Sequence, residues 1–254
     1  MTPDIELLEV DARTLFLLSH DERIDRENDP DRSPGPAFWM AGCGSGNVLR
    51  LRTDIADEIA AKIETLAESE PPLAGVESRP QHLDRYLDML GDGVAPMQAT
   101  QELIYELPHV LACKGGATLI ASDSPEGQDL VQALSRRGMP EGLSSLGFRQ
   151  IEDLWPPWCA AMVDGEIASL AFTTRLSAVG AELGLATVKD LRGQGFAAAA
   201  TAGWSSLPML HSRALFYSTS RTNLSSQRVV ARLGLRFIGT SFRIAPLAPG
   251  AEPP

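Results

Sequence analysis

This 254-residue sequence has few of the residues on which disulfide-rich and metal-binding proteins depend. Its three cysteines, Cys43, Cys113 and Cys159, are too few and too scattered for a disulfide framework. None stands at metal-ligand spacing from another cysteine or a histidine, and the four histidines are dispersed. The sequence therefore predicts neither a disulfide scaffold nor a metal site.

Long apolar runs are also missing. No run approaches the ~20 residues that a membrane-spanning helix requires. The first residues, MTPDIELLEVDAR, lack the basic and apolar blocks of a signal peptide. With a hydrophobic fraction of 44%, the chain is predicted to be a soluble, cytoplasmic globular protein that makes no use of a membrane.

A basic surface is absent as well, because the formal net charge is −11. Residues 1–110 contain 22 acidic and 9 basic side chains, whereas the remaining 144 residues contain 11 and 13. Nucleic acid is therefore excluded as the main partner, since phosphate binding needs a basic face. The slightly basic C-terminal part suits a polyanionic cofactor instead.

The most informative stretch of the chain is ELGLATVKDLRGQG, residues 182–195, followed by an alanine-rich run. Its first half is typical of a short buried strand, and its end indicates a glycine turn that opens a helix. The first amides of a helix have no partners inside it, and glycines let a phosphate approach the backbone. The stretch predicts an anion cradle; an ordinary helix cap is the alternative.

Other segments have simpler interpretations. The glycine-rich stretch at 42–47 predicts a hairpin turn rather than a second phosphate loop, because no helix follows it. Residues 20–36 are predicted to form an exposed loop, and Asp54 to begin a helix. Asp164-Gly165 predicts a tight hairpin.

Two motifs resemble the GNAT acetyltransferase superfamily. Arg192-x-x-Gly195-x-Ala197 fits its R/Q-x-x-G-x-G/A pattern, which binds the pyrophosphate of acetyl-coenzyme A (acetyl-CoA). About 30 residues on, Asn223-x-x-Ser226 begins a helix that ends in Leu-Gly-Leu, as in the family's last strand–helix unit. The resemblance covers roughly residues 115–245.

The resemblance implies a set of cofactor-binding residues. The backbone of Val188 would pair with the pantetheine arm, and Asn223 and Ser226 would lie near that arm. The pyrophosphate would be held by the backbone amides of Gln194, Gly195, Phe196 and Ala197, with Arg192 and Gly193 completing the loop. Arg228 and Arg232 are expected to keep their helix soluble rather than to reach a phosphate.

Glu182 is the candidate general base. It stands six residues before Val188, so that both side chains face the same side of a regular strand. A carboxylate in an apolar strand is costly unless it is paired or used. Two alternatives to a catalytic role are that Glu182 is a structural residue in a salt bridge, or that it lies at the exposed start of the strand.

One departure from the family pattern concerns the acid. Many members carry a tyrosine seven residues after the asparagine, where it would protonate the leaving thiolate. Here that position is Val230, and the nearest hydroxyls by sequence are Tyr217, Ser218 and Ser220. The sequence therefore assigns no general acid.

Together these features predict an α/β protein with a GNAT-like mixed sheet flanked by helices at 114–245. A smaller N-terminal α/β domain of unknown role occupies 1–113, and a disordered tail occupies 246–254. The predicted activity is an N-acetyltransferase that moves an acetyl group from acetyl-CoA to a primary amine of a small molecule or protein, without a metal. A non-catalytic acyl-CoA-binding or regulatory module and a ligand-free interaction domain are the alternatives. The sequence does not identify the acceptor of the acetyl group, and it does not decide whether the protein forms a homodimer.

Overall fold

The computed structural model describes residues 2–91, 96–112 and 116–247. Its contacts divide the chain into two compact units. The first unit contains the described residues up to Tyr105, Ser218–Asn223 and those from Phe237 on; the second contains Glu106–Tyr217 and Leu224–Arg236. The predicted boundary at 113 and 114, and most of the predicted tail, lie outside the described residues.

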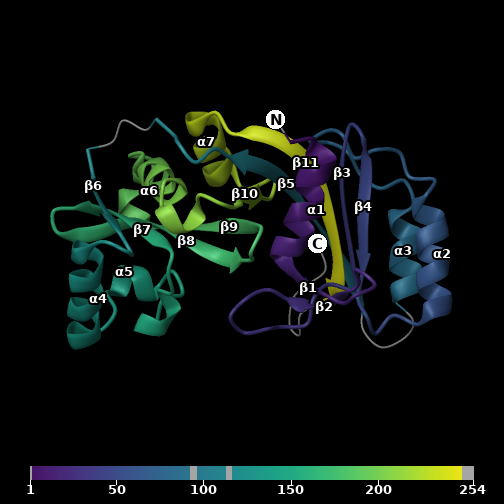
Figure 1. The fold of residues 1–254 in the computed structure, drawn as a ribbon, viewed down its shortest axis with the longest axis horizontal. Helices are drawn as coiled ribbons and strands as arrows, with labels where there is room; N and C mark the ends of the chain where they lie inside the picture. The colour runs from purple at the N-terminus through teal and green to yellow at the C-terminus, as the bar shows by residue number, and fades with distance from the viewer. Residues whose placement is uncertain (1, 92–95, 113–115, 248–254) are drawn as a thin grey trace. The chain divides into compact units, whose positions relative to one another are not determined.

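The first unit contains a four-stranded arrangement in the order β4-β3-β11-β5 (Figure 1). Strand β3 pairs antiparallel with both of its neighbours. The elements are α1 (Asp4–Leu15), β1 (Phe16–Leu18), β2 (Ile24–Glu27), β3 (Phe38–Cys43), β4 (Gly46–Leu51), α2 (Asp57–Ala67), α3 (Leu83–Leu90), β5 (Met97–Leu107) and β11 (Arg236–Pro246).

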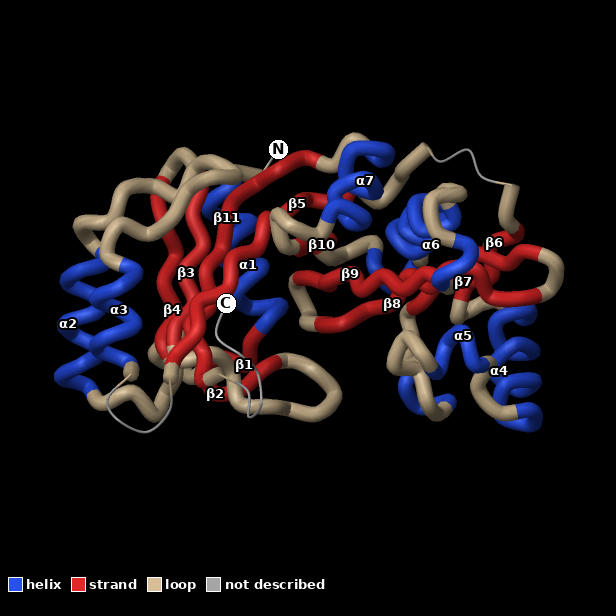
Figure 2. The backbone as a smooth tube through the Cα atoms, turned by 180° about the vertical axis from the view of Figure 1, so that it is seen from behind, coloured by secondary structure: helices blue, strands red, loops and turns tan. Residues whose placement is uncertain are grey.

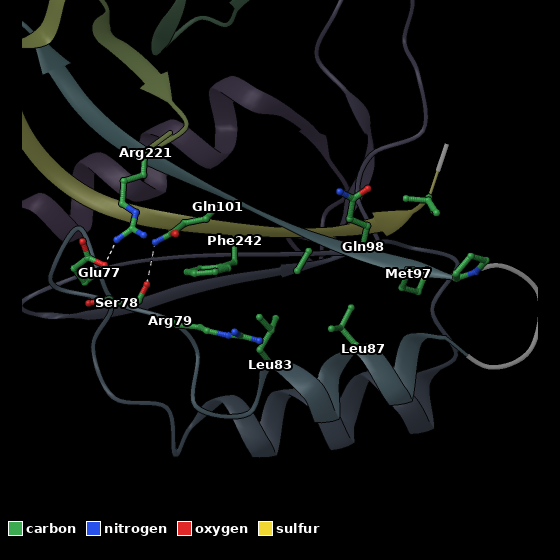
Figure 3. Close-up of a pocket in the computed structure, with 13 residues that line it drawn as sticks. Glu77, Ser78, Arg79, Leu83, Leu87, Met97, Gln98, Gln101, Arg221 and Phe242 are labelled. Atoms are coloured by element: carbon green, nitrogen blue, oxygen red, sulfur yellow. Dashed lines mark hydrogen bonds and ion pairs between the residues drawn. The ribbon is translucent and has the colours of Figure 1, made fainter. Parts of the chain in front are cut away.

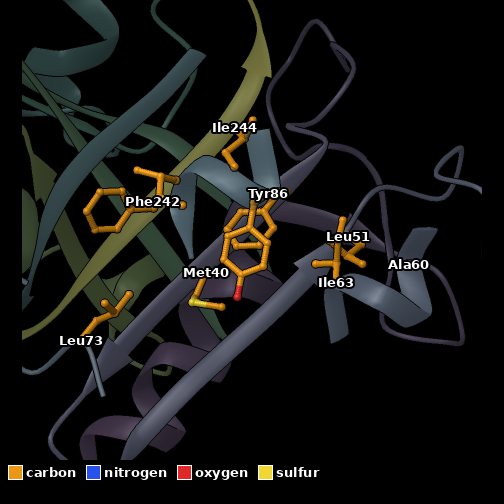
Figure 4. Close-up of a cluster of buried hydrophobic side chains, with 10 residues drawn as sticks. Met40, Leu51, Ala60, Ile63, Leu73, Tyr86, Phe242 and Ile244 are labelled. Atoms are coloured by element: carbon orange, nitrogen blue, oxygen red, sulfur yellow. The ribbon is translucent and has the colours of Figure 1, made fainter. Parts of the chain in front are cut away.

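Strand β3 is buried on both faces of this sheet. Phe38 and Met40 join a core cluster with Tyr86 of α3 and with residues of α2 and β11 (Figure 4). Trp39, whose side chain alternates to the other face, packs edge-to-face on Phe16 with ring centroids 5.8 Å apart. The unbroken apolar run of β3 follows from this burial on both sides.

The glycine-rich stretch at 42–47 is the tip of a hairpin, as predicted. Cys43 pairs with Gly46 and Gly42 with Asn47, so that the turn consists of Gly44 and Ser45. The stretch therefore joins two strands of a sheet and opens no helix.

Two local predictions in this unit were wrong. The helix begins at Asp57 instead of Asp54, because the Asp54 carboxylate accepts hydrogen bonds from Arg52 Nε at 2.7 Å and Nη2 at 3.0 Å. This interaction also lowers the pKa of Asp54. The predicted loop at 20–36 contains β2, which pairs antiparallel with β1.

The second unit contains a five-stranded arrangement in the order β10-β9-β8-β7-β6 (Figure 2). Strands β9 and β10 are parallel and the other neighbours antiparallel. The predicted α/β class with a mixed, helix-flanked sheet is thus confirmed. The elements are β6 (Thr118–Ala121), α4 (Pro125–Arg137), α5 (Glu141–Ser144), η1 (Ile151–Asp153), β7 (Trp158–Val163), β8 (Glu166–Leu176), β9 (Gly180–Thr187), η2 (Lys189–Leu191), α6 (Phe196–Ser205), η3 (Pro208–Leu210), β10 (Ala214–Thr219) and α7 (Leu224–Leu233).

Helices cover both faces of this sheet. Leu134 of α4 and Leu143 of α5 share a core cluster with Leu170 of β8. On the other face, Trp204 of α6 donates its indole N–H to the Thr173 hydroxyl of β8 at 3.1 Å. The face of β9 on which a side chain lies therefore decides whether it meets α4 and α5 or α6.

Two turns in the second unit form as the sequence predicts. Asp164 and Gly165 both have positive φ, 50° and 83°, as the tight hairpin between β7 and β8 requires. Helix α7 ends at Gly234, whose φ is 62°, and the Leu235 amide donates back to the Val230 carbonyl at 3.1 Å. In the described part of the chain, no helix is long and apolar enough to cross a membrane.

Candidate functional site

The two parallel strands of the second unit pair over a short length only. Ala214 to Phe216 of β10 stand opposite Gly180 to Glu182 of β9. Beyond Glu182, the described pairs of β9 are with β8 alone. The later half of β9 therefore has one edge to which a ligand can add in the manner of a strand.

The pairing with β8 decides which backbone groups of β9 face that open edge. The Val188 amide donates to the Ala168 carbonyl at 3.0 Å, and the Val188 carbonyl accepts from Leu191 at 3.0 Å. In an antiparallel pair, alternate residues turn their backbone groups to the partner strand. Leu185 and Thr187 therefore turn theirs to the open edge, whereas both groups of Val188 are already engaged.

The predicted anion loop leads directly from β9 into α6. Gly193 and Gly195 have φ values of 79° and 94°, a conformation that favours glycine. Gly195 is the N-cap of the ten-residue helix, which has no acidic residue in its first turn. Within the described residues, the amides of Gln194 to Ala197 find no hydrogen-bond acceptor, and the first bond of the helix is from Ala199 to Gly195.

Arg192 fastens the start of this loop to the end of the strand. Its Nε donates to the Thr187 carbonyl at 3.3 Å, and the residue is exposed. The side chain thus has a structural partner close to the open edge of β9. The loop amides beyond it are held at a fixed distance from the strand.

Glu182 is buried, with 8% of its surface exposed. Its Oε2 accepts a hydrogen bond from the Thr174 hydroxyl at 3.2 Å and lies 3.8 Å from Arg175 Nη1. By strand alternation its side chain lies on the α4 and α5 face, as does that of Val188, which is next to Gly142 of α5. The ion pair matches one of the alternatives open to this residue, that of a salt-bridged structural residue.

Tyr217 follows the last residue of β10 that pairs with β9. It is 3% exposed, and burial raises the pKa of its phenol, an effect that the nearby Ser226 side chain opposes. Ser226 is on α7, and Val230, at the family's usual tyrosine position, is buried on the same helix. The phenol and the Ser226 hydroxyl are therefore brought together, and Val230 offers no proton.

Asn223 directly precedes α7, in the position of an N-cap. Asn223 is exposed, and its backbone amide donates to the Ser220 carbonyl at 3.0 Å. Its contacts assign it to the first unit. Ser226 belongs to the second unit. The predicted pair Asn223 and Ser226 is thus divided between the two units.

For Arg232, the sequence interpretation favoured solubility over a phosphate contact, and it did not place this residue at the anion loop. A Cβ atom added to Gly195 would lie 2.6 to 2.7 Å from three atoms of the Arg232 guanidinium, so this group lies against the anion loop. The two residues are 37 positions apart, and no periodic pattern connects them. The only signal was the presence of arginines on a helix that follows the loop.

The first unit has a cavity of about 530 Å³ beside α3 and β5 (Figure 3). Leu83, Leu87, Met97 and Phe242 supply apolar walls. At its polar end the side chains bond within the unit: Arg221 pairs with Glu77, Gln101 donates to the Ser78 carbonyl at 3.1 Å, and Arg79 pairs with Asp84 at 3.3 Å. No catalytic group is assembled among the described residues that line it.

The described residues contain no group of three or more side chains that could hold a metal ion. Cys43 and Cys159 are buried free thiols, and burial raises the pKa of Cys159 to about 12. Cys113 lies outside the described residues.

No family model matches the chain, and no curated protein matches it. Among solved structures it resembles an acetyltransferase of the GNAT family from Colwellia psychrerythraea, with 18% identity and a TM-score of 0.40; the match covers 64% of this chain and 62% of that one, less than two thirds of its length. The chain is also similar to a GCN5-related N-acetyltransferase from Kribbella flavida, with 18% identity and a TM-score of 0.44; the match covers 67% of this chain and 65% of that one. A GCN5-related N-acetyltransferase from Sphaerobacter thermophilus is similar with 13% identity and a TM-score of 0.41, over 91% of this chain and 85% of that one. These neighbours carry the family name that the two motifs indicate. Because the likeness is loose, the proposals below rest on the geometry of the loop and the strands.

Proposed function

We propose that this protein is an N-acetyltransferase that moves an acetyl group from acetyl-CoA to a primary amine of a small molecule or protein. The observation that carries the proposal is the group of acceptor-free amides from Gln194 to Ala197 at the positive end of α6. A helix N-terminus of this kind is an anion site. The strand edge that opens beside it offers a place for an extended arm.

The residues present fit acetyl-CoA at two places. Gly193 and Gly195 leave the loop without Cβ atoms, so that the pyrophosphate can approach the amides. The backbone of Leu185 and the Thr187 amide offer hydrogen bonds to the pantetheine arm, a role that the family resemblance gave to Val188. Ser226, beside Tyr217, remains a candidate contact for the same arm.

Glu182 is the proposed general base. Its carboxylate would take the proton of the attacking amine, directly or through one water. Burial removes competing solvent, and the Arg175 guanidinium holds the carboxylate in place. Proton transfer back to solvent would restore it.

The proposed reaction needs no side-chain acid at position 230. Bound acetyl-CoA would supply the acetyl group as a thioester, and a thiol with an ordinary pKa of about 8.5 is a tolerable leaving group. Helix-terminal amides stabilise negative charge nearby. Tyr217, whose phenol is buried, is assigned a packing role.

The test has two stages. Calorimetric titration with acetyl-CoA should give saturable binding at one site per chain, and at least one amine of a panel should then release free thiol from acetyl-CoA. Absence of any binding by the folded protein would overturn the proposal.

A non-catalytic acyl-CoA-binding module is the second candidate. Val230 in place of the tyrosine and the Arg175 ion pair of Glu182 favour it. It predicts that acetyl-CoA binds tightly but releases no thiol with any amine of the panel. The two stages of the test therefore separate the candidates.

A further inference from the structure

The guanidinium of Arg232 has no hydrogen bond or ion pair with any described residue. It nevertheless lies against Gly195, where an added Cβ would come within 2.6 Å of Nη1 and 2.7 Å of Cζ and Nη2. Gly195 is the N-cap of α6. A cation thus stands directly beside the amides that we assign to the pyrophosphate.

This placement is electrostatically unfavourable in the protein alone. The N-terminus of a helix carries a partial positive charge, which repels cations and attracts anions. Acidic residues usually compensate there, but the first turn of α6 contains none. An anion held between the loop amides and the guanidinium would turn this repulsion into two attractive contacts.

We propose that Arg232 is a cofactor-binding residue that holds the pyrophosphate of the cofactor together with the loop amides. This inference rests on the proposed function, since it concerns the same anion loop. The planar guanidinium can offer two parallel N–H groups to one phosphate. Because it lies at Gly195 and not further along the chain, the pyrophosphate is its partner and the 3′-phosphate of the adenosine is not.

A structural role for the same residue makes different predictions. Arg232 is in the last turn of α7, where a cation complements the negative end of the helix dipole. That role stabilises the free protein and has no effect on ligand affinity. Arg228 is exposed on the same helix one turn earlier, which makes it the matched control.

The experiment titrates coenzyme A and dephospho-coenzyme A, which lacks the 3′-phosphate, into the wild type, Arg232→Gln and Arg228→Gln by calorimetry. We expect Arg232→Gln to weaken both ligands by the same factor, about tenfold to a hundredfold, as for loss of a charge-assisted hydrogen bond. Arg228→Gln should bind both like the wild type. Thermal unfolding without ligand checks that each variant is folded.

Equal affinity of folded Arg232→Gln and wild type would overturn the proposal. So would a loss confined to coenzyme A, because it would assign Arg232 to the 3′-phosphate. If Arg232→Gln does not fold, Arg232→Lys keeps the charge and serves instead: it should weaken both ligands alike, whereas wild-type affinity for both contradicts the bidentate contact. If the wild-type protein binds neither ligand, the proposed function itself is contradicted. That outcome differs from those that contradict only the role of Arg232.

Discussion

Glu70 in the first unit and Glu182 in the second are buried to the same extent, but their contacts differ. Glu70 in the first unit is 8% exposed, and its carboxylate accepts the backbone amides of Gln81 at 2.6 Å and His82 at 2.8 Å. Glu182 in the second unit is also 8% exposed, yet its contacts with Thr174 and Arg175 are 3.2 and 3.8 Å long. Two short hydrogen bonds hold Glu70 at the start of α3, whereas the contacts of Glu182 are longer.

The two glycine-rich stretches differ in the same way. At 42–47 the chain turns back into a strand, and the residues on each side of the turn pair across the hairpin. At 192–195 it runs on into α6, and the next amides have no acceptor among the described residues. The element that follows the glycines therefore decides whether their backbone groups are satisfied within the fold or left for a ligand.

The largest expected effect compares the two glutamates. Glu182→Gln should lower turnover by roughly 10²–10⁴, because a neutral amide cannot take the proton of the amine. Affinity for acetyl-CoA should stay nearly unchanged. Steady-state thiol release with the best amine of the panel measures the first quantity, and calorimetry the second.

Glu70→Gln is the matched control. It should lower the free energy of unfolding by about 1–3 kcal/mol, since one of its two backbone partners loses an acceptor, while turnover of the folded fraction stays the same. Unchanged turnover in Glu182→Gln at every pH would remove Glu182 from the mechanism and make the two glutamates alike.

The next effect compares the two glycine stretches. Gly195→Glu should weaken acetyl-CoA binding by well over tenfold, because ~1.4 kcal/mol already makes that factor. The new side chain would displace the Arg232 guanidinium, which lies 2.6 Å from the added Cβ, and it would bring a negative charge to the anion site at a residue whose φ of 94° favours glycine. Gly44→Glu, at a hairpin position with open space around it, should bind as the wild type does. A folded Gly195→Glu that binds with wild-type affinity would place the cofactor elsewhere.

A smaller effect tests the packing role of the first stretch. A Cβ at Gly42 would lie 2.7 Å from Leu73 Cβ and 2.8 Å from its backbone nitrogen. Gly42→Ala should therefore lower the free energy of unfolding by about 1–3 kcal/mol through overpacking. Gly44→Ala, with no atom nearby, should change it little. Chemical denaturation measures both, and equal stabilities would mean that β3 moves to make room.

The smallest effect concerns Tyr217. Tyr217→Phe should reduce turnover less than tenfold, because its phenol packs in the second unit and donates no proton to the leaving thiol. Burial raises its pKa above the ordinary value, so the phenol stays protonated at neutral pH and the pH–rate profile should not shift below about pH 10. A thousandfold loss in a folded variant that binds acetyl-CoA would show that Tyr217 is the acid.

Local chemistry in the sequence predicted the turns and helix ends well. Asp164 and Gly165 have positive φ in the tight hairpin that the sequence predicts there. The strand, loop and start of α6 followed from the order of apolar residues, glycines and alanines. These features depend on neighbours in the chain, which is why a sequence reveals them.

Contacts between distant residues could not be predicted in this way. The contact of Arg232 with Gly195 depends on how α7 packs in the second unit, which no residue pattern encodes. Likewise, Arg175 becomes the partner of Glu182 only through the register of β8 and β9.

The place of β11 also has a consequence for biosynthesis. Among the strands that the structure describes, β11 is synthesised last, yet in the first unit it lies between β3 and β5. Until it is made, β3 and β5 have no common neighbour, and the apolar face that Phe242 and Ile244 cover stays open. The second unit contains nearly all of its strands in one continuous stretch and can form earlier. Nascent chains that stop before Arg236 should therefore expose the hydrophobic face of β3 to chaperones.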